Sequence, residues 1–435
     1  MLNPKILYIS SANPLEGPGR GALNVVNALK NAGLTVDFMT LNPVANHPEI
    51  IFVQDPPTIL DKIKRKILNI WGSFRSGVWP GKEAKQGYYF FYKKEKYPPV
   101  STDQVLSKIT EKYDLVWIYF WQGMLSFETV NALYEKLKCT FFFVCADYSV
   151  MSGGCHFTAD CDRFKIGCGK CTAWNSNSIN DFTHWNVIYR QNIYEKIKPV
   201  ILCNTYMKKF FFDESFLLKN ARVEVTPPVV DSNLFHPIEK IELKDKYSIP
   251  QDIEFVIGFG SQKVDDPRKG FTYFVDAIKL LYSKLTEQER KKVLLLSIGK
   301  NEERIKSMFP FKMMCLGYMP FDKLSEFYSL SDVFVCTSVN DAGPSMVGQA
   351  ISCGTPVVGF EMGALLDWVL NKGTGYCAKL RDSNELSDLL LKLFRMQRGD
   401  RNALSEHCRS VALSYSMDNR VEYWMSLYDK YRKIS

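Results

Sequence analysis

Short apolar runs alternate with amphipathic stretches along most of the chain. The first apolar run, residues 5–10, leads into a turn rich in glycine and polar residues, and residues 22–32 then place their apolar side chains on one helical face. A second apolar run follows at 34–40. Strand, glycine-containing loop, helix and strand in this order predict a βαβ unit and therefore a parallel sheet.

The same alternation restarts at residue 253, after a linker that ends near Pro237. Further short strands are expected at 113–120, 139–144, 199–204, 223–228, 255–260, 293–299, 314–317, 333–336 and 356–360. A chain of 435 residues is also long enough for two domains. We therefore predict two doubly wound α/β domains, 1–228 and 229–415, and a C-terminal helix, 416–435, for which packing across both domains is one arrangement.

A loop that leaves one predicted strand and opens a helix begins at residue 340. Its sequence, Asn-Asp-Ala-Gly-Pro-Ser, contains glycine and proline, and a short helix with small residues follows. The backbone N–H groups and the positive dipole end of such a helix attract an anion. Asp341 and Gln349 bracket the loop and the helix, an arrangement that suits a nucleoside diphosphate.

Arg268, Lys269 and Gly270 stand at the start of another predicted helix, 271–285. A cationic pair at a helix N-terminus is typical of phosphate sites. The alternative is an ordinary charged helix start, although cations at that end oppose the helix dipole. Because of that mismatch, we favour the phosphate site.

The amino-acid composition favours a soluble globular protein. The chain is 46% apolar and 23% charged, with a net charge of +8, which is typical of a soluble globular protein with a modest basic excess. It contains neither a nucleic-acid recognition pattern nor a signal peptide, and no apolar window is long enough to span a membrane. We therefore expect a cytoplasmic protein with mostly reduced cysteines and no nucleic-acid partner.

Residues 59–71 predict a basic amphipathic helix. In one interpretation its apolar face packs on the core and its cations face solvent. In the other, the helix contacts a membrane surface or an acceptor phosphate. The second interpretation would place the protein peripherally at the cytoplasmic face of the inner membrane.

Four cysteines gather in a glycine-rich stretch: Cys155, Cys161, Cys168 and Cys171. The last two have the spacing of a zinc knuckle, whereas the first pair is wider than usual. A structural zinc ion is the favoured interpretation, with two disulfides or unliganded thiols as alternatives. A catalytic zinc is not expected, because four cysteine ligands leave no open position.

The second half of the chain resembles the retaining, nucleotide-sugar-dependent glycosyltransferases of the GT-B fold, family 4. The resemblance rests on Arg268-Lys269-Gly270, Leu316-Gly317-Tyr318, residues 331–335, the stretch 341–358 and Gly375-Tyr376. The family pattern has two Glu where this chain has Asp341 and Gln349, and often an Arg at the position of Ser261. The resemblance implies an α/β GT-B fold with two Rossmann-like domains and an interdomain cleft, the first domain binding the acceptor and the second the nucleotide sugar.

The resemblance also implies roles for individual residues. Arg268 and Lys269 would neutralise the leaving diphosphate, Asp341 would contact the donor sugar, and Gln349 would hold the ribose. The remaining contacts with the base and the phosphates would come from Gly19, Tyr318, Gly343, Pro344, Ser345 and Met346. Enzymes of this kind are thought to need neither a protein nucleophile nor a catalytic metal.

Residues 151–175 resemble a cysteine-rich insert, marked by Gly153-Gly154-Cys155-His156, found in a bacterial surface-polysaccharide subset of these transferases. The His-Asp pair that usually precedes the insert is Ala146-Asp147 here, and an upstream His-Trp pair is Phe120-Trp121. We expect Asp147 to take part in catalysis. His156 is either a structural hydrogen-bonding residue or one that orients the acceptor or the donor.

The sequence thus predicts an enzyme that moves a sugar from a UDP- or GDP-linked donor to a glycan acceptor. A lipid-linked acceptor in bacterial surface-polysaccharide or glycoconjugate biosynthesis is the favoured version. One alternative is a catalytically inactive partner subunit that binds a nucleotide or a sugar. Another is a GT-B enzyme of different chemistry, such as a sugar epimerase.

Overall fold

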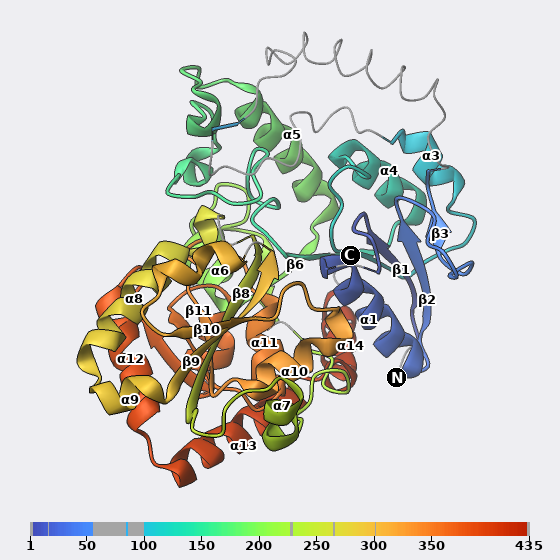
Figure 1. Cartoon of the computed structure of the whole chain (residues 1–435). Helices are drawn as coiled ribbons and strands as arrows, with labels where there is room; N and C mark the ends of the chain where they lie inside the picture. The colour runs from blue at the N-terminus through green and yellow to red at the C-terminus, as the bar shows by residue number, and fades with distance from the viewer. Residues whose placement is uncertain are drawn as a thin grey trace, which may run out of the picture. The chain divides into compact units, whose positions relative to one another are not determined.

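The computed structural model describes residues 3–15, 17–54, 84–85, 100–226, 229–263, 266–300 and 302–432. The predicted basic helix at 59–71 lies outside these residues. By its internal contacts the chain divides into two units (Figure 1). The first comprises residues 1–203, 207–226 and 420–435, and the second comprises residues 204–206 and 227–419.

The first unit contains a seven-stranded sheet with the order β3-β2-β1-β4-β5-β6-β7. Every neighbouring pair in it is parallel. The chain starts in the middle of the sheet, fills one side and then the other, so the sheet is doubly wound. The strands are β1 (Lys5–Ser10), β2 (Thr35–Thr40), β3 (Ile51–Phe52), β4 (Leu115–Ile118), β5 (Thr140–Val144), β6 (Val200–Cys203) and β7 (Arg222–Val225).

Helices and short helical turns connect these strands. They are α1 (Gly17–Asn31), α3 (Thr102–Ser107), α4 (Phe127–Leu137), η1 (Arg163–Ile166), η2 (Thr172–Trp174), α5 (Phe182–Ile197), α6 (Thr205–Met207) and η3 (Lys208–Phe212). The C-terminal helix, α14 (Met417–Arg432), follows the second unit in the chain.

An aromatic cluster binds the C-terminal helix into the core of the first unit. Trp117 of β4 stacks on Tyr8 of β1 and meets Phe142 of β5 edge-on, with ring centroids 5.6 Å apart in both pairs. Trp424 of α14 makes a T-shaped contact with the Trp117 ring at 5.4 Å. The hydroxyl of Tyr423 also donates to the carbonyl of Val225 over 2.9 Å. Most of α14 therefore packs with the first unit, although the residues before it belong to the second.

The second unit contains a six-stranded sheet with the order β10-β9-β8-β11-β12-β13, again parallel throughout. Its strands are β8 (Phe255–Lys263), β9 (Val293–Lys300), β10 (Lys312–Cys315), β11 (Val333–Cys336), β12 (Val357–Phe360) and β13 (Gly375–Ala378). Its helices and helical turns are α7 (Lys240–Lys246), η4 (Pro267–Lys269), α8 (Phe271–Lys284), α9 (Glu287–Lys291), η5 (Glu302–Met308), η6 (Phe321–Lys323), α10 (Leu324–Leu330), α11 (Ser345–Ser352), η7 (Leu366–Leu370), α12 (Ser383–Arg395) and α13 (Arg398–Ser414).

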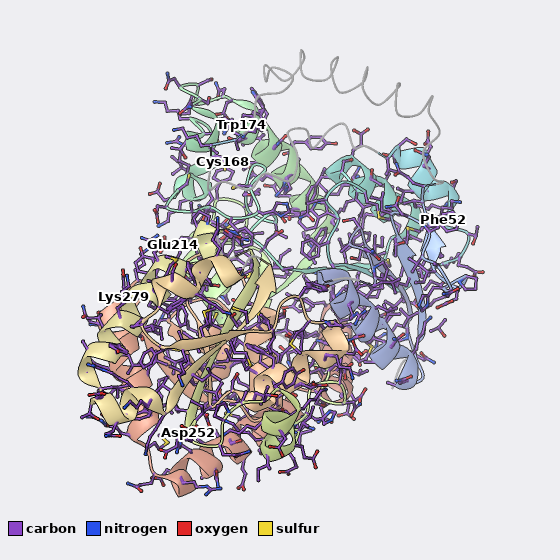
Figure 2. The ribbon with its side chains drawn as sticks, viewed as in Figure 1. Phe52, Cys168, Trp174, Glu214, Asp252 and Lys279 are labelled. Carbon is purple, nitrogen blue, oxygen red and sulfur yellow. The ribbon has the colours of Figure 1, made fainter. Side chains whose placement is uncertain are left out.

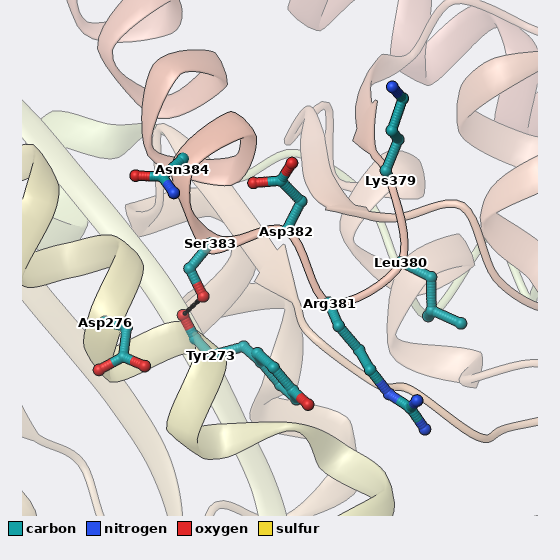
Figure 3. A pocket seen from close by; sticks show the side chains of 8 residues that line it. All are labelled: Tyr273, Asp276, Lys379, Leu380, Arg381, Asp382, Ser383 and Asn384. Atoms are coloured by element: carbon teal, nitrogen blue, oxygen red, sulfur yellow. Dashed lines mark hydrogen bonds between the residues drawn. The ribbon is translucent and has the colours of Figure 1, made fainter. Parts of the chain in front are cut away.

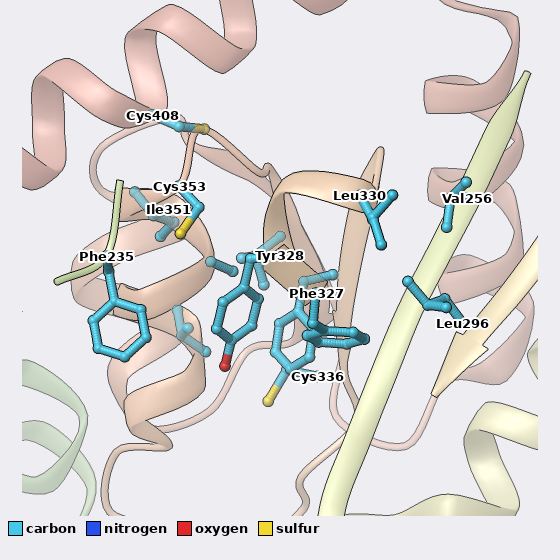
Figure 4. Packing of buried hydrophobic residues seen from close by; sticks show 14 of the residues in the cluster. Phe235, Val256, Leu296, Phe327, Tyr328, Leu330, Cys336, Ile351, Cys353 and Cys408 are labelled. Atoms are coloured by element: carbon cyan, nitrogen blue, oxygen red, sulfur yellow. The ribbon is translucent and has the colours of Figure 1, made fainter. Parts of the chain in front are cut away.

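Successive residues of a strand point to opposite faces of this sheet, and each face has its own apolar core. Val256 and Leu296 enter the core that contains α10 and α11, where Tyr328 and Cys353 also pack (Figure 4). Phe255 and its neighbours on the other face pack with α8 and α12. Because both faces are covered, the strands read in the sequence as continuous apolar runs and not as alternating ones.

The prediction of two doubly wound parallel sheets is confirmed. The boundaries differ in places. β10 ends at Cys315 and not at residue 317, because Gly317 adopts a left-handed backbone with φ 70° that cannot continue a strand. β3 and β13 were missed. The two residues of β3 are too short to give a periodic signal, and β13 is a four-residue strand that begins with glycine and is mostly half-buried. No helix in the described part of the chain is long and apolar enough to cross a membrane.

Candidate functional site

Two loops at the carboxyl edge of the second sheet form the candidate site. One follows β8 and contains residues 266–270, and the other follows β11 and contains residues 337–344. β8 and β11 are hydrogen-bonded neighbours in the sheet, so the loops that leave them lie side by side. This edge is where ligands of parallel α/β sheets bind.

Hydrogen bonds join these two loops. The hydroxyl of Thr337 donates to the carbonyl of Lys269 over 3.0 Å, and the N–H of Val339 donates to the carbonyl of Arg268 over 2.7 Å. Gly270 closes the first loop with φ 62°, and a Cβ at this residue would lie 2.0 Å from the Thr337 carbonyl oxygen. Glycine is therefore required here both by the backbone conformation and by the close approach of the second loop.

An ion pair connects the same loops through their side chains. Lys269 Nζ lies 2.5 Å from Asp341 Oδ2. Asp341 is only 8% exposed, and its Oδ1 accepts a hydrogen bond from the N–H of Gly343 over 3.2 Å. The Asp341 carboxylate thus pairs with the Lys269 cation of the first loop and also accepts a hydrogen bond within the turn of the second loop.

Arg268 has a carboxylate partner of its own. Its guanidinium lies 2.6 Å from Asp266 Oδ2, while Asp266 Oδ1 accepts from the Arg268 N–H over 3.0 Å. The sequence placed two cations at a helix start, where they oppose the dipole, and Asp266 and Asp341 offset that charge. The two predicted phosphate-binding cations are therefore brought together and held in place before any ligand binds.

Backbone N–H groups of α11 open onto the same edge. Pro344 occupies the N-cap position, and its side chain makes no capping hydrogen bond. The N–H of Val347 donates to the Pro344 carbonyl over 3.1 Å, whereas no described residue accepts from the N–H groups of Ser345 and Met346, which suits an anion there. The predicted phosphate contacts Gly343, Pro344, Ser345 and Met346 lie in this turn, and their contact with phosphate stays a prediction.

Gln349 has a partner that the sequence analysis missed. Its Oε1 accepts a hydrogen bond from the Tyr328 hydroxyl over 2.8 Å, and both residues are buried. Burial raises the pKa of Tyr328 well above its ordinary value, so the phenol stays protonated. Tyr328 lies in an apolar helical pattern, and nothing in that pattern distinguishes a hydroxyl with a polar partner from a core aromatic residue.

Tyr318 stands apart from this buried group. It is 70% exposed and follows β10, the edge strand, whereas the two loops follow β8 and β11. Its contact with a nucleotide base stays a prediction.

In the first unit, Asp147 lies just beyond β5. Its Oδ1 accepts from the N–H of Ser149 over 2.8 Å, and its Oδ2 lies 2.5 Å from His156 Nδ1. The carboxylate is buried and lines a narrow pocket with Tyr119 and Gln122 at the ends of β4 and β5. Burial, and then the charge of Asp147, raises the pKa of Tyr119 well above its ordinary value. The structure thus pairs His156 with Asp147, a contact that the sequence left open.

Gly19 has a structural explanation. It is buried near the start of α1, and a Cβ there would lie 2.0 Å from the carbonyl oxygen of Asn13. The turn after β1 approaches the helix too closely for a side chain at this residue. A ligand contact at Gly19 stays a prediction.

The four insert cysteines lie near one another in the first unit, the part of the chain where Figure 2 labels Cys168 and Trp174. Burial first, and then nearby thiols, raise the pKa of Cys168 to about 12 and that of Cys171 to about 11. The N–H groups of Ala173 and Trp174 donate to the Cys171 sulfur.

These cysteines form neither disulfides nor a complete metal cage. All twelve cysteines of the chain are free thiols. Within the described residues, no group of three or more His, Cys, Asp or Glu side chains is arranged to hold a metal ion. The thiols lie near one another, and zinc remains a prediction.

An open depression lies elsewhere on the second unit, between the starts of α8 and α12 (Figure 3). Lys379 and Arg381 line it together with Asp276 and Asp382, and the Ser383 hydroxyl donates to the Tyr273 carbonyl over 3.1 Å. None of the predicted site residues lines it, and its charges have both signs. We do not assign a ligand to it.

Part of the second unit matches a known protein family. Residues 241–411 match the family described as Glycosyl transferases group 1. The match covers most of the second unit and less than half of the chain. The matched residues include both loops of the candidate site and all of α11.

Curated relatives match over about half of their length. N-acetyl-alpha-D-glucosaminyl L-malate synthase of Bacillus anthracis is 21% identical over 218 residues, which cover 48% of this chain and 54% of the relative. Mannosylfructose-phosphate synthase of Agrobacterium fabrum is 22% identical over 232 residues, covering 49% and 48%. The chain thus spans about half the length of the curated relatives that it matches.

Solved structures match over nearly the whole chain. Sucrose-phosphate synthase from Thermosynechococcus elongatus superposes with a TM-score of 0.64 at 15% identity, covering 99% of this chain and 100% of that one. Anabaena Alr3699/HepE in complex with UDP-glucose gives a TM-score of 0.61 at 14% identity, covering 97% and 99%. At such identities the likeness establishes the fold alone. The predicted GT-B fold is confirmed.

Replacing Gly270 with alanine should destabilise the second unit. The new Cβ would have to push the Thr337 carbonyl away, which separates the two loops. We expect a loss of about 1–3 kcal/mol in the free energy of unfolding, measured by denaturant unfolding. Gly399→Ala is the matched control, because a Cβ there meets nothing within 4 Å. A Gly270→Ala variant as stable as this control would contradict the packing described.

Proposed function

We propose that the protein is a retaining glycosyltransferase that moves a sugar from a nucleotide-sugar donor to a glycan acceptor. The observation that carries the proposal is the pair of loops joined by Lys269 and Asp341 beside the uncapped start of α11. Paired cations and free N–H groups at a helix start suit a diphosphate. The match to the group 1 family supports the proposal, as do fold neighbours whose structures hold UDP, UDP-glucose or ADP.

In this proposal the second unit stabilises the leaving group. The bond between the sugar's anomeric carbon and the phosphate oxygen breaks, and the acceptor hydroxyl oxygen forms the new bond on the same face. The hydroxyl proton passes to the leaving phosphate, and a nucleoside diphosphate departs. Lys269, Arg268 and the N–H groups of α11 would offset the charge that grows on the phosphate, where one fixed donor can contribute about 10²–10³ in rate. No protein nucleophile and no catalytic metal are invoked.

We infer that the first unit binds the acceptor. Asp147 and His156 form a polar pair at the carboxyl ends of β4 and β5, where acceptor hydroxyls would find hydrogen-bonding partners. The proposed acceptor is a lipid-linked glycan of bacterial surface-polysaccharide or glycoconjugate synthesis, met at the cytoplasmic face of the membrane. This finer assignment rests on the sequence of the cysteine-rich insert. The basic segment 59–71, proposed as the membrane contact, lies outside the described residues.

The transfer reaction can be tested with a variant of the loop-joining cation. Purified protein is incubated with UDP- and GDP-sugars and lipid-linked glycan acceptors, and acceptor-dependent release of nucleoside diphosphate is measured. We expect Lys269→Gln to lower kcat by about 10²–10³.

Lys279→Gln is the matched control, because this lysine lies on the exposed face of the adjoining α8 (Figure 2). A thermal midpoint recorded for each variant separates loss of activity from loss of folding. Donor binding without any transfer by the wild type would favour the inactive partner subunit. An unchanged kcat in folded Lys269→Gln would remove this residue from the reaction.

Structural zinc is a separate proposal, and it rests on clustered thiols and not on a formed cage. Cys155, Cys161, Cys168 and Cys171 supply four sulfur ligands, the number that closed structural zinc sites use. We expect elemental analysis of protein purified without chelator to find close to one equivalent of zinc, and removal of the zinc to lower the thermal midpoint. Less than half an equivalent of zinc would contradict this proposal and favour free thiols.

A further inference from the structure

The hydrogen bond between Tyr328 and Gln349 fixes the orientation of a side chain at the candidate donor site. Tyr328 is completely buried, and its hydroxyl lies 2.8 Å from Gln349 Oε1. If the amide were turned the other way, its NH₂ group would face the phenol, and the buried O–H hydrogen would lose its acceptor. A buried donor without an acceptor is strongly disfavoured. The amide oxygen therefore faces Tyr328.

With its oxygen toward Tyr328, the Gln349 amide points its NH₂ group away from the phenol. In the described part of the chain, no residue accepts a hydrogen bond from Gln349 Nε2. Gln349 lies four residues after Ser345, so the two residues share one face of α11. Side chains of a helix also lean toward its N-terminus. The NH₂ group is thus the part of Gln349 that is left for a ligand bound near the start of α11.

We propose that Tyr328 is a positioning residue that makes Gln349 a hydrogen-bond donor to the bound nucleotide. The group it recognises is an acceptor oxygen of a nucleoside diphosphate, on its ribose or its phosphates. The inference rests on the proposed function, since it assumes that a nucleoside diphosphate occupies this edge. It goes beyond that proposal in two ways. It makes Gln349 the donor in its hydrogen bond with the nucleotide, and it assigns Tyr328 the role of orienting the Gln349 amide.

Nucleotide binding by four proteins tests the role of Tyr328. Isothermal titration calorimetry first finds which of UDP, GDP and ADP the wild type binds most tightly. That nucleotide is then titrated into Tyr328→Phe, Gln349→Ala and the double variant. Losing the phenol hydroxyl frees the amide to turn, so we expect Tyr328→Phe to bind about threefold to tenfold more weakly. The double variant should bind no more weakly than Gln349→Ala alone, because Tyr328 acts through Gln349.

Tyr247→Phe is the matched control for losing a hydroxyl in the same unit. The Tyr247 hydroxyl donates to Glu326 of α10 over 2.7 Å, and neither residue belongs to the two loops. The Tyr247→Phe variant should bind the nucleotide as tightly as the wild type does. If Tyr328→Phe weakens binding equally in the wild-type and Gln349→Ala backgrounds, Tyr328 acts through the general packing of the core, and the proposal is overturned.

Gln349→Glu tests the polarity directly. A carboxylate can accept the hydrogen bond from Tyr328, but it cannot donate to the ligand. We expect at least about tenfold weaker binding for this variant. Binding as tight as the wild type, or tighter, would show that the ligand donates at this position and would overturn the inference. A wild type that binds none of the three nucleotides would contradict the proposed function, and the inference with it.

Discussion

The ion pair between Lys269 and Asp341 is the contact on which the candidate donor site depends. The side chains are 27% and 11% exposed, so removing either partner leaves a largely buried charge without its counter-ion. The pair can form because β8 and β11 are neighbours and because Gly270 lets the two loops touch. The ion pair therefore fixes the Lys269 cation relative to the turn at Asp341 and the start of α11 before a ligand binds. Such preorganisation is what electrostatic stabilisation of a leaving group requires.

One rule of parallel sheets accounts for the polar groups in both units. Strands that point the same way place the residues that follow them along one edge. In the second unit this edge collects two cations, their carboxylate partners and the start of α11. In the first unit it collects Asp147, its partner His156 and the hydroxyl of Tyr119. Each unit therefore offers its own set of polar groups, one suited to a diphosphate and one to hydroxyls.

The sequence predicted most of the strands, the two parallel sheets and the location of the second-unit loops, because apolar runs and glycine-containing turns are local signals. It could not predict the side-chain pairs. Tyr328 and Gln349 lie on different helices, and His156 meets Asp147 across a turn of the insert. Periodicity carries no information about such contacts, which depend on tertiary packing. Gly19 adds a close approach of backbone that the sequence did not reveal, because a Cβ there would lie 2.0 Å from the Asn13 carbonyl oxygen.

The most direct test of the account is the preference of the protein for a second phosphate group. The dissociation constants of UDP and UMP, and of GDP and GMP, are measured for the wild type and for Lys269→Gln. The account predicts that the wild type binds one diphosphate at least about tenfold more tightly than its monophosphate, and that Lys269→Gln loses most of this preference. A preference of the same size in both proteins would show that Lys269 does not bind the phosphates and would contradict the central claim.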